Sequence, residues 1–498
     1  MIYLVSNSKE LQESNLYKCI SLKESLGLLN SWQIIQVDTE TTGRDAHINT
    51  LLCVQFGNDK ADTQIVVDCT TIDIKEYKQI LESKFLVLQN AKFDIQFFYS
   101  YGIIPRNVYD TMIVEQLLYL GYPSGQISYS LKAIAERRLN ICLDKTVRGE
   151  IIWRGLDERV IEYAASDVKH LQQIMKLQLE DCKKQGLYKA AEIECKFVPA
   201  IAYLEWCGIH LDANKWKAKM QKDSENLEES IKALNAFVIK TPSLKQFTFI
   251  DTQGDLFTGF NLEPQVTINW ASSQQVVQVA KILGFNTTTQ DKKTGEDKDS
   301  VMEKHLKSQK GINDEFLKLY FGKGNPGDED YYPGYSGSAK VVSSFGQGHL
   351  NAINPKTNRI HTQYRQLGAS SGRMSCGSQQ PNNDLAKLKG ISPKECTYPN
   401  MQQLPSDEET RSCFTAPDGY LWCACDFSAL ESRLGADIYN EKSMLDEFLQ
   451  GSGDMHSLCA YMVYDEIPRD TPIKDIKKLY PHLRKAVKGI ELSSEDSL

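Results

Sequence analysis

The segment Tyr420–Ala436, YLWCACDFSALESRLGA, constrains the fold more strongly than any other stretch of this chain. Its residues Leu421–Cys425 are apolar and uncharged, which is typical of a strand buried on both faces. The run ends on Asp426, and helical spacing follows from Ser428 onward. A carboxylate at the tip of such a strand can bind a divalent metal, because rigid backbone holds it beside open solvent. The simpler alternative is that Asp426 only caps the helix.

The chain of 498 residues is too long for one hydrophobic core, so we expect about two to four domains. Its 13 cysteines include no CxxC pair, which suits a reducing cytosol better than a disulfide framework. No apolar run reaches membrane-spanning length, and the first residues lack the features of a signal peptide. We therefore expect a cytoplasmic protein without a membrane segment.

The net charge of -8 argues against a uniformly basic nucleic-acid binder. The stretch from Lys340 to Gly390 differs, because it holds seven Lys or Arg residues and the single acid Asp384. Such a block can follow a phosphate backbone. The alternative is a solvated loop surface.

Carboxylates stand at the ends of predicted elements in the first 195 residues. The predicted strand Gln33–Val37 leads into Asp38 and Glu40, which share a face because residues two apart on a strand point the same way. Asp94 follows another apolar strand, Phe85–Gln89, where a new helix begins. A surface turn with two acids is the alternative for the first pair.

A second group lies in a predicted helical stretch from about Asp157 to Gln185. Tyr163 and Asp167 are one helical turn apart there and project from the same face. Asp110 begins a further helix and is explained as a helix cap.

The four acids Asp38, Glu40, Asp94 and Asp167 can together hold two hard divalent ions. Two such ions, about 3.5–4 Å apart, clamp the attacking and leaving oxygens of a phosphodiester. The hydroxyl of Tyr163 would then orient the attacking water.

The motifs DxE, NxxFD and YxxxD occur in this order and resemble the proofreading 3′–5′ exonucleases of the DEDD superfamily, tyrosine subtype. The resemblance covers roughly residues 30 to 180. It implies a ribonuclease H-like exonuclease domain over residues 1–195, a mixed sheet flanked by helices. It also implies action on single-stranded 3′ ends with two Mg²⁺ or Mn²⁺ ions.

The region of residues 196–345 predicts helices and loops without a catalytic set. A long, mostly exposed helix is expected at Ala213–Ala236, and a compact amphipathic helix within Asn269–Gly284. The polar residues 285–311 and the Gly- and Pro-rich stretch Gly322–Gly337 predict loops.

The last region carries SSGRMS, PNMQQLP, the pair Arg411 and Phe414, DFSALESRLGA, GDMH and RKAVKG. Together these motifs resemble family A DNA polymerases over roughly residues 200 to 490. The resemblance implies an α/β and α+β multidomain protein, in which an incomplete palm, thumb and fingers polymerase domain follows the exonuclease domain. The start of the palm and the helical thumb would occupy 196–345, the palm with motif A 346–480, and the start of the fingers 481–498.

The resemblance also implies roles by position. Asp426 would bind both catalytic Mg²⁺ or Mn²⁺ ions, one of them with the carbonyl of Phe427. Glu431 would be the steric gate that excludes a ribose 2′-hydroxyl. Primer–template DNA would be contacted in the minor groove by Arg373 and Gln402.

The incoming dNTP would be bound by His456, Arg484 and Lys488. The last two residues are one turn apart and present two cations on one helix face, which suits a triphosphate. The resemblance further implies a role in DNA replication, in a phage-infected bacterial host.

The chain departs from the family pattern at three places, one of which is Ala429, where many relatives carry a polar residue. Residues 376–398 separate two motifs that usually lie close together, so this loop is predicted to be lineage-specific. After Lys488 the sequence reads GIELSSEDSL, where an aromatic residue, Tyr-Gly and a later His-Asp-Glu would be expected. We therefore expect an incomplete palm, completed by a second polypeptide or interrupted by an intervening sequence.

Two other classes remain open at this point. One is a stand-alone nuclease similar to the RNase D group, with a helical RNA-binding tail. The other is a non-catalytic remnant that binds DNA in a salt-dependent manner.

Overall fold

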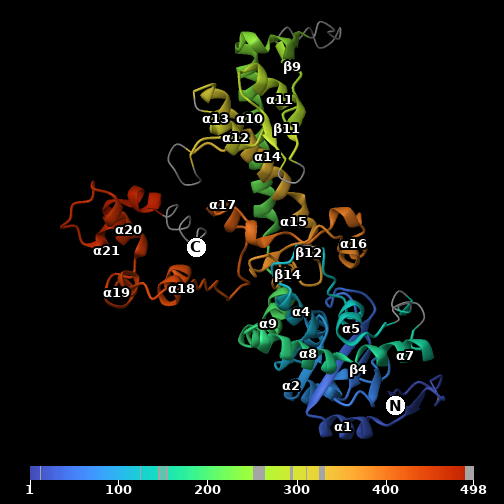
Figure 1. Cartoon of the computed structure of the whole chain (residues 1–498). Coiled ribbons are helices and arrows are strands. Elements are labelled where there is room, and N and C mark those ends of the chain that lie inside the picture. The colour runs from blue at the N-terminus through green and yellow to red at the C-terminus, as the bar shows by residue number, and fades with distance from the viewer. Residues whose placement is uncertain are drawn as a thin grey trace, which may run out of the picture. The chain divides into compact units, whose positions relative to one another are not determined.

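The computed structural model describes residues 1–498 except 12, 124, 144–146, 148–149, 152–154, 251–263, 292–294, 310, 325–330 and 488–498. The chain divides into two compact units, Met1–Pro417 and Asp418–Leu498 (Figure 1). The predicted domain boundaries at residues 195, 345 and 480 stay predictions.

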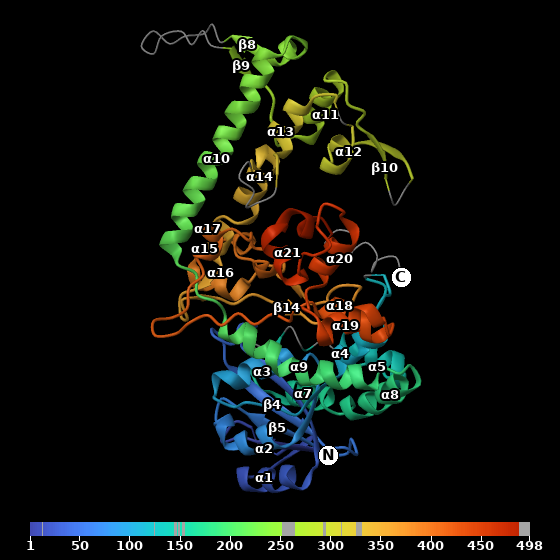
Figure 2. The ribbon, with the colours of Figure 1, turned by 90° about the vertical axis from the view of Figure 1, so that its left-hand side faces the viewer.

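A seven-stranded mixed sheet forms the N-terminal part of the first unit (Figure 2). Its strand order is β2-β1-β5-β4-β3-β6-β7. The central strands β3, β4 and β5 pair antiparallel, and the other neighbours pair parallel. The strands are β1 (Ile2–Val5), β2 (Tyr17–Cys19), β3 (Ile34–Thr41), β4 (Leu51–Gly57), β5 (Gln64–Asp68), β6 (Phe85–Leu88) and β7 (Val108–Asp110).

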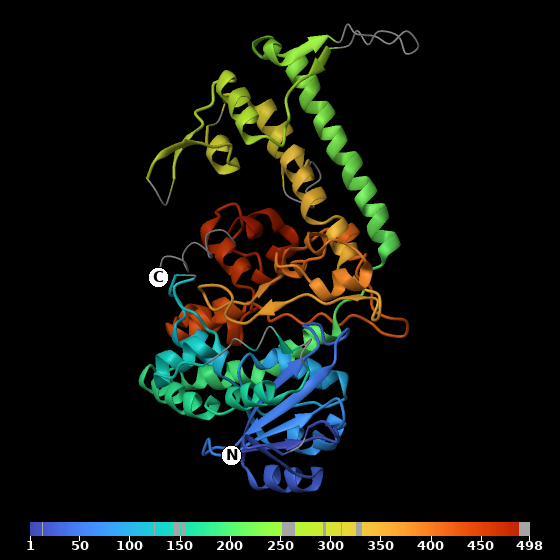
Figure 3. The ribbon, with the colours of Figure 1, turned by 90° about the vertical axis from the view of Figure 1, so that its right-hand side faces the viewer.

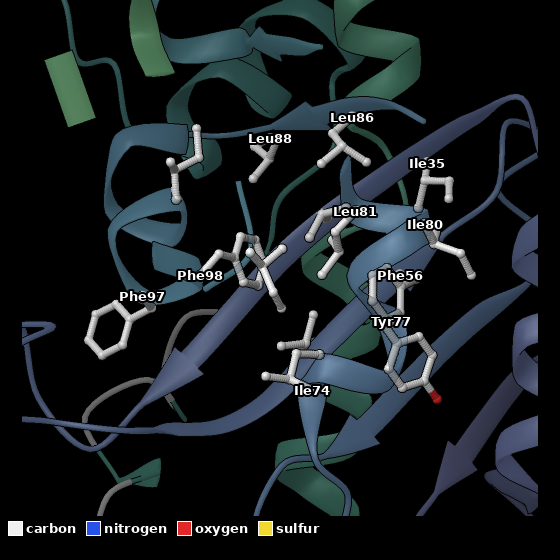
Figure 4. Close-up of a cluster of buried hydrophobic side chains, with 14 of the residues drawn as sticks. Ile35, Phe56, Ile74, Tyr77, Ile80, Leu81, Leu86, Leu88, Phe97 and Phe98 are labelled. Atoms are coloured by element: carbon white, nitrogen blue, oxygen red, sulfur yellow. The ribbon is translucent and has the colours of Figure 1, made fainter. Parts of the chain in front are cut away.

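Successive side chains of a strand point to opposite faces of this sheet, and apolar side chains are buried on both faces. Ile65 and Val67 face a large core cluster that also holds Phe56 and Phe98 (Figure 4). Val66, between them, faces the opposite side and packs in a separate cluster with Ala164. Each fully buried large apolar side chain contributes roughly 1.5–3 kcal/mol. The first face is covered by α1 (Leu22–Ser31), η1 (Ile74–Tyr77), α2 (Lys78–Ser83) and α3 (Ala91–Ser100), and the second by α7 (Glu158–Asp167).

The helical stretch predicted from about Asp157 to Gln185 is interrupted, and in this respect the prediction was wrong. The helix α7 ends at Asp167, and α8 (Leu171–Lys184) begins after a short break. The side chain of Gln36 in β3 accepts the backbone N–H of Gln172 at 2.9 Å, so a contact with the sheet replaces a helical hydrogen bond. The helices α4 (Thr111–Leu118), α8 and α9 (Tyr188–Cys207) pack together around Val87.

The helix α10 (Ala213–Lys240) begins at Asp212, whose carboxylate accepts the N–H groups of Asn214 and Lys215. It covers the predicted helix and continues to Lys240. It packs against α13 (Asp314–Phe321) and α14 (Gly334–Ser344) (Figure 3). Their shared core also includes α11 (Ser273–Ile282), the helix predicted within Asn269–Gly284.

The prediction that residues 285–311 form a loop was wrong. The strands β10 (Thr288–Gln290) and β11 (Asp297–Asp299) pair antiparallel, and α12 (Glu303–Lys307) follows. Phe285 and Leu306 are buried in the helical core and hold both ends of this stretch. The helix α14 likewise starts at Gly334, within the second predicted loop.

Short antiparallel pairs replace the single strand predicted from Arg359 to Tyr364. β13 (Arg359–Ile360) pairs with β12 (Ile353–Asn354), and β14 (Tyr364–Arg365) pairs with β15 (Ser375–Cys376). The remaining elements of the first unit are α5 (Leu131–Leu139), η3 (Pro242–Phe247), β8 (Thr248–Ile250), β9 (Pro264–Val266), α15 (Gln347–Asn351), α16 (Asn383–Lys389), η4 (Pro393–Glu395), η5 (Met401–Gln403) and α17 (Glu408–Arg411).

A buried carboxylate joins the sheet part of this unit to the β14 region. Glu205 in α9 is 5% exposed and accepts three hydrogen bonds. They come from Lys92 Nζ at 2.6 Å, Gln96 Nε2 at 2.7 Å and the backbone N–H of Tyr364 at 2.5 Å. A buried acid is tolerated when it is paired and hydrogen-bonded in this way.

The second unit is helical, with α18 (Leu430–Ile438), α19 (Lys442–Gln450), α20 (Met455–Val463) and α21 (Ile473–Leu479). Ala460, Ile467, Ile476 and Val487 form its small core. Throughout the described parts of both units, each helix is too short or too polar to cross a bilayer.

The buried side chain of His349 leads us to expect that the first unit loses folding stability at acid pH. Burial and then the charge of Lys219 lower the pKa of His349 to about 4. Below pH 6.5 the unfolded chain binds a proton that the folded chain does not, so stability falls as the pH drops from about 6.5 towards 4. The loss from this one side chain is about 2 kcal/mol at pH 5. In His349→Phe, the thermal midpoint should fall less between pH 7 and pH 5 than in the unaltered protein. Equal losses would contradict the prediction.

Candidate active site

The strand β3 presents two acids on one face. Asp38 and Glu40 are alternate residues of the strand and lie opposite Gln55 and Cys53 of β4. Both acids are half-buried. Pairing with β4 fixes the backbone of both residues, while the pairing of β3 with β6 ends before them, at Gln36.

The end of α7 adds Asp167, which is 4% exposed. Gly57 at the end of β4 allows this approach, because a Cβ atom there would lie 2.2 Å from the carbonyl oxygen of Val168. The residue after Asp167 thus touches the backbone of the sheet. A glycine is required at this position by close packing.

Oxygen atoms of Asp38, Glu40 and Asp167 lie within 4.8 Å of one another. Among the residues that the structure describes, this is the group of three or more acidic, His or Cys side chains close enough to hold a metal ion. Three carboxylates this close repel each other unless a cation neutralises them. Oxygen ligands of this kind fit Mg²⁺ or Mn²⁺, and the residues therefore fit the divalent ions expected from the sequence.

Asp94, the fourth predicted acid, lies in the wall of the same cleft but outside this group of three. It is 1% exposed, and its Oδ1 accepts a hydrogen bond from Thr39 Oγ1 at 2.6 Å. Burial and then the negative charge of Asp38 raise the pKa of Asp94 well above its ordinary value. The assignment of Asp94 as a metal ligand stays a prediction.

Asp110 fixes the start of the helix α3, which carries Asp94. The backbone of Asn90 adopts a positive φ of 60° at the turn from β6 into α3. The carboxylate of Asp110 accepts the N–H groups of Asn90 and Ala91 at 3.0 and 2.8 Å, and that of Met112 at 2.8 Å. Burial raises the pKa of Asp110 to about 6. The sequence-based interpretation of Asp110 as a helix cap is confirmed, and the residue also ties two strand-to-helix turns together.

Tyr163 lies one turn before Asp167 on α7 and is 6% exposed. Its pKa is raised by burial first, and then by the negative charges of Asp167 and Glu40. The hydroxyl therefore stays protonated and can donate a hydrogen bond at neutral pH. A cleft of about 1040 Å³ is lined by Tyr163 and the four acids.

Gln55 is a site residue that the sequence analysis missed. Its side chain is completely buried, and its Nε2 donates to Asp38 Oδ2 at 2.8 Å. The sequence feature that could have pointed to it is a glutamine inside the otherwise apolar run Leu51–Gly57. In the structure this glutamine lies opposite Asp38 in the antiparallel pair of β3 and β4. Without the register of β3 and β4, this glutamine has no visible partner.

The residues predicted to contact DNA lie on the surface of the first unit. Arg373 is exposed in the turn before β15, and its carbonyl accepts the N–H of Ala369 at 3.0 Å. Gln402 is exposed in η5. Phe414, a motif residue without a predicted contact, packs edge-on against Trp216, with the ring centroids 5.7 Å apart. Their roles stay predictions.

The buried strand predicted at Leu421–Cys425 does not form, which corrects the expectation for Asp426. Leu421 is 96% exposed and Phe427 is 77% exposed, and Asp426 is exposed as well. A strand buried on both faces needs neighbouring strands to bind its N–H and C=O groups. None of the described strands pairs with this segment. Glu431 is exposed on α18, which starts at Leu430, two residues later than predicted.

His456 and Arg484, predicted to bind the triphosphate, both lie in the second unit. His456 is half-buried on α20. The guanidinium of Arg484 makes two hydrogen bonds to Asp454, Nε to Oδ2 at 3.0 Å and Nη2 to Oδ1 at 2.9 Å. A triphosphate would have to displace this carboxylate. Lys488 lies outside the described residues.

The sheet, its covering helices and the acidic cleft are those of a ribonuclease H-like nuclease domain. A family model described as 3′–5′ exonuclease matches residues 15–180, and one described as DNA polymerase family A matches residues 263–490. The chain belongs to the family A DNA polymerases, and its N-terminal part is a 3′–5′ exonuclease domain.

Curated relatives are similar over most of this chain. DNA polymerase I of Aquifex aeolicus is 25% identical over 466 residues, which are 89% of this chain and 66% of the relative. DNA polymerase I of Pseudomonas aeruginosa is 26% identical over 483 residues, 90% of this chain and 45% of that relative. The chain thus spans about half to two thirds of the length of these relatives.

A solved structure shares the fold. The POL domain of Pol1 from M. smegmatis, in complex with DNA primer-template and dNTP, has a TM-score of 0.66 and 18% sequence identity. The match covers 96% of this chain and 70% of that chain. None of these comparisons supports the second polypeptide expected from the sequence.

Gly57→Ala should weaken metal binding. The added Cβ would force Val168, and with it Asp167, away from β3, and we expect an affinity for Mn²⁺ about tenfold lower by calorimetric titration. The matched control is Gly27→Ala in α1, where nothing lies within 4 Å of the added Cβ. That control should keep the Mn²⁺ affinity and gain up to about 1 kcal/mol of helix stability. Unchanged Mn²⁺ binding in Gly57→Ala would show that this approach does not place Asp167.

Proposed function

We propose that the N-terminal part of the chain hydrolyses the terminal phosphodiester of single-stranded DNA from its 3′ end. The observation that carries the proposal is the group of three carboxylates within 4.8 Å at the edge of an open cleft. The match to the 3′–5′ exonuclease model supports the direction of attack.

Asp38, Glu40 and Asp167 would hold the divalent ions, and Asp94 would complete the set from the cleft wall. When bound, two such ions activate a water and neutralise the charge that develops on the phosphate. Gln55 fixes the orientation of the Asp38 carboxylate through its 2.8 Å hydrogen bond. Tyr163 stays protonated and orients the attacking water by its hydroxyl.

Asp38→Ala and Glu40→Ala should each abolish most of the metal-dependent trimming of a 5′-labelled single strand. We expect a loss of at least about a hundredfold, because each change removes a charged ligand from the group of three. Chelation by EDTA should have the same effect on the unaltered protein. The control is Glu136→Ala, an exposed acid on α5. Undiminished trimming in the first two variants would refute the site, and faster trimming of RNA than of DNA would favour an RNase D-like enzyme.

We further propose that residues 346–498 bind primer–template DNA and dNTP in the manner of a family A polymerase, in the course of DNA replication. The match to the polymerase model and the basic stretch from Lys340 to Gly390 support this proposal. Asp426 would bind metal together with the Phe427 carbonyl, and Glu431 would face the sugar of the nucleotide. His456, Arg484 and Lys488 would contact its phosphates.

Arg373→Ala should weaken binding of primer–template DNA in an anisotropy titration. Loss of one cationic contact should also lower the magnitude of the salt slope, the change of log K with log salt, by about 1. Arg106→Ala, at another exposed arginine, should leave both values unchanged. An unaltered salt slope in Arg373→Ala would show that Arg373 does not contact the DNA.

A further inference from the structure

A second cleft adjoins the acidic cleft in the first unit. It has a volume of about 630 Å³, and Arg44, Asn90, Phe93, Met112 and Tyr129 line both clefts. Beyond this shared wall, the lining of the second cleft includes residues 361–368 and Tyr398, together with Lys92 and the carboxylates Asp45, Asp110 and Glu205. A nucleic-acid strand that enters the acidic cleft along this path therefore passes Arg44.

The loop that carries Arg44 is held by a carboxylate from a distant part of the chain. Asp384 Oδ2 accepts the backbone N–H of Arg44 at 2.7 Å, that of Asp45 at 3.0 Å and the side chain of Asn49 at 2.9 Å. A Cβ on Gly43 would lie 2.5 Å from Asn49 Oδ1, so a larger residue there would displace the Asn49 side chain that donates to Asp384. Three donors on one oxygen leave this loop little freedom to move.

Asp384 lies in residues 376–398, the stretch that separates two polymerase motifs. The stretch is closed at its base by two hydrogen bonds between Ser378 and Tyr398, at 2.9 and 3.1 Å. Asn382 caps α16, and the buried side chains of Leu385 and Cys396 pack against Ile48 of the exonuclease loop. Residues 376–398 thus pack against the loop that carries Arg44 and hold it in place.

The charge of Arg44 is available to a ligand. Its side chain is exposed, and none of the described carboxylates forms an ion pair with the guanidinium. The negative charge of Asp384 is taken up by the N–H groups of the loop instead. A guanidinium at the joint wall of two clefts suits a phosphate, which it can bind with two parallel hydrogen bonds.

We propose that Arg44 binds a backbone phosphate of the single strand in the exonuclease cleft, and that Asp384 is the positioning residue that holds Arg44 there. This inference rests on the proposed exonuclease function. The metal-binding carboxylates are held by β3 and α7 and not by Asp384. Loss of either residue should therefore raise KM and leave kcat nearly unchanged.

The test measures KM and kcat for trimming of a labelled single strand by Arg44→Ala, Arg44→Lys, Asp384→Ala and the double variant Arg44→Ala/Asp384→Ala. We expect KM about tenfold higher in both alanine variants, with kcat within about twofold. Arg44→Lys should recover part of the loss, because the charge remains. The double variant should be no worse than Arg44→Ala, because both changes remove one contact. Arg106→Ala is the control and should keep the KM of the unaltered protein.

Binding of the labelled strand in EDTA separates this inference from the proposed function. If the unaltered protein does not trim DNA but binds the strand about tenfold more tightly than Arg44→Ala, the proposed activity fails and the inference stands. Unchanged KM and unchanged binding in Arg44→Ala would overturn the inference. The inference would also be overturned if the increases in KM of the two single variants multiplied in the double variant, because Asp384 would then act independently of Arg44.

Discussion

The fold of the first unit has to hold three carboxylates together against their mutual repulsion. One oxygen of each lies within 4.8 Å of the others. The backbone of Asp38 and Glu40 is fixed by pairing with Gln55 and Cys53 of β4, and α7 holds Asp167 against the end of β4. Burial of apolar side chains on both faces of the sheet opposes this repulsion. A divalent cation would relieve it, which is why a stable fold can keep an acidic cleft ready for metal.

Three other carboxylates of the unit accept several hydrogen bonds each from nearby N–H groups. Asp110 and Asp384 face backbone N–H groups, and Glu205 faces a lysine, an amide and an N–H group. These acids join segments that are far apart in sequence, and their negative charge is satisfied inside the protein. These three acids therefore act as links between segments and lie outside the group of three carboxylates.

Two of these structural acids connect the exonuclease domain to the segments that follow it. Glu205 binds the helix α3, which carries Asp94, to the backbone of Tyr364. Asp384 binds the loop after β3 to the stretch between two polymerase motifs. The exonuclease cleft is therefore shaped in part by residues more than 250 positions away.

The order of the motifs and the strands β4, β5 and β6 could be predicted from the sequence to within one residue, because the apolar runs and the turn and helix-start signals are local. The strand β3 was predicted only to Val37, whereas it continues through Asp38 and Glu40 to Thr41. The break after Asp167, the pairing of Gln55 with Asp38 and the separate place of Asp94 could not be predicted, because each depends on the register or close packing of other elements. The exposed run Leu421–Cys425 shows the same limit, since an apolar pattern becomes a buried strand only where neighbouring strands exist to pair with it. The sequence by itself determined the family and the kinds of side chain at the site, and the tertiary structure decided which of them meet.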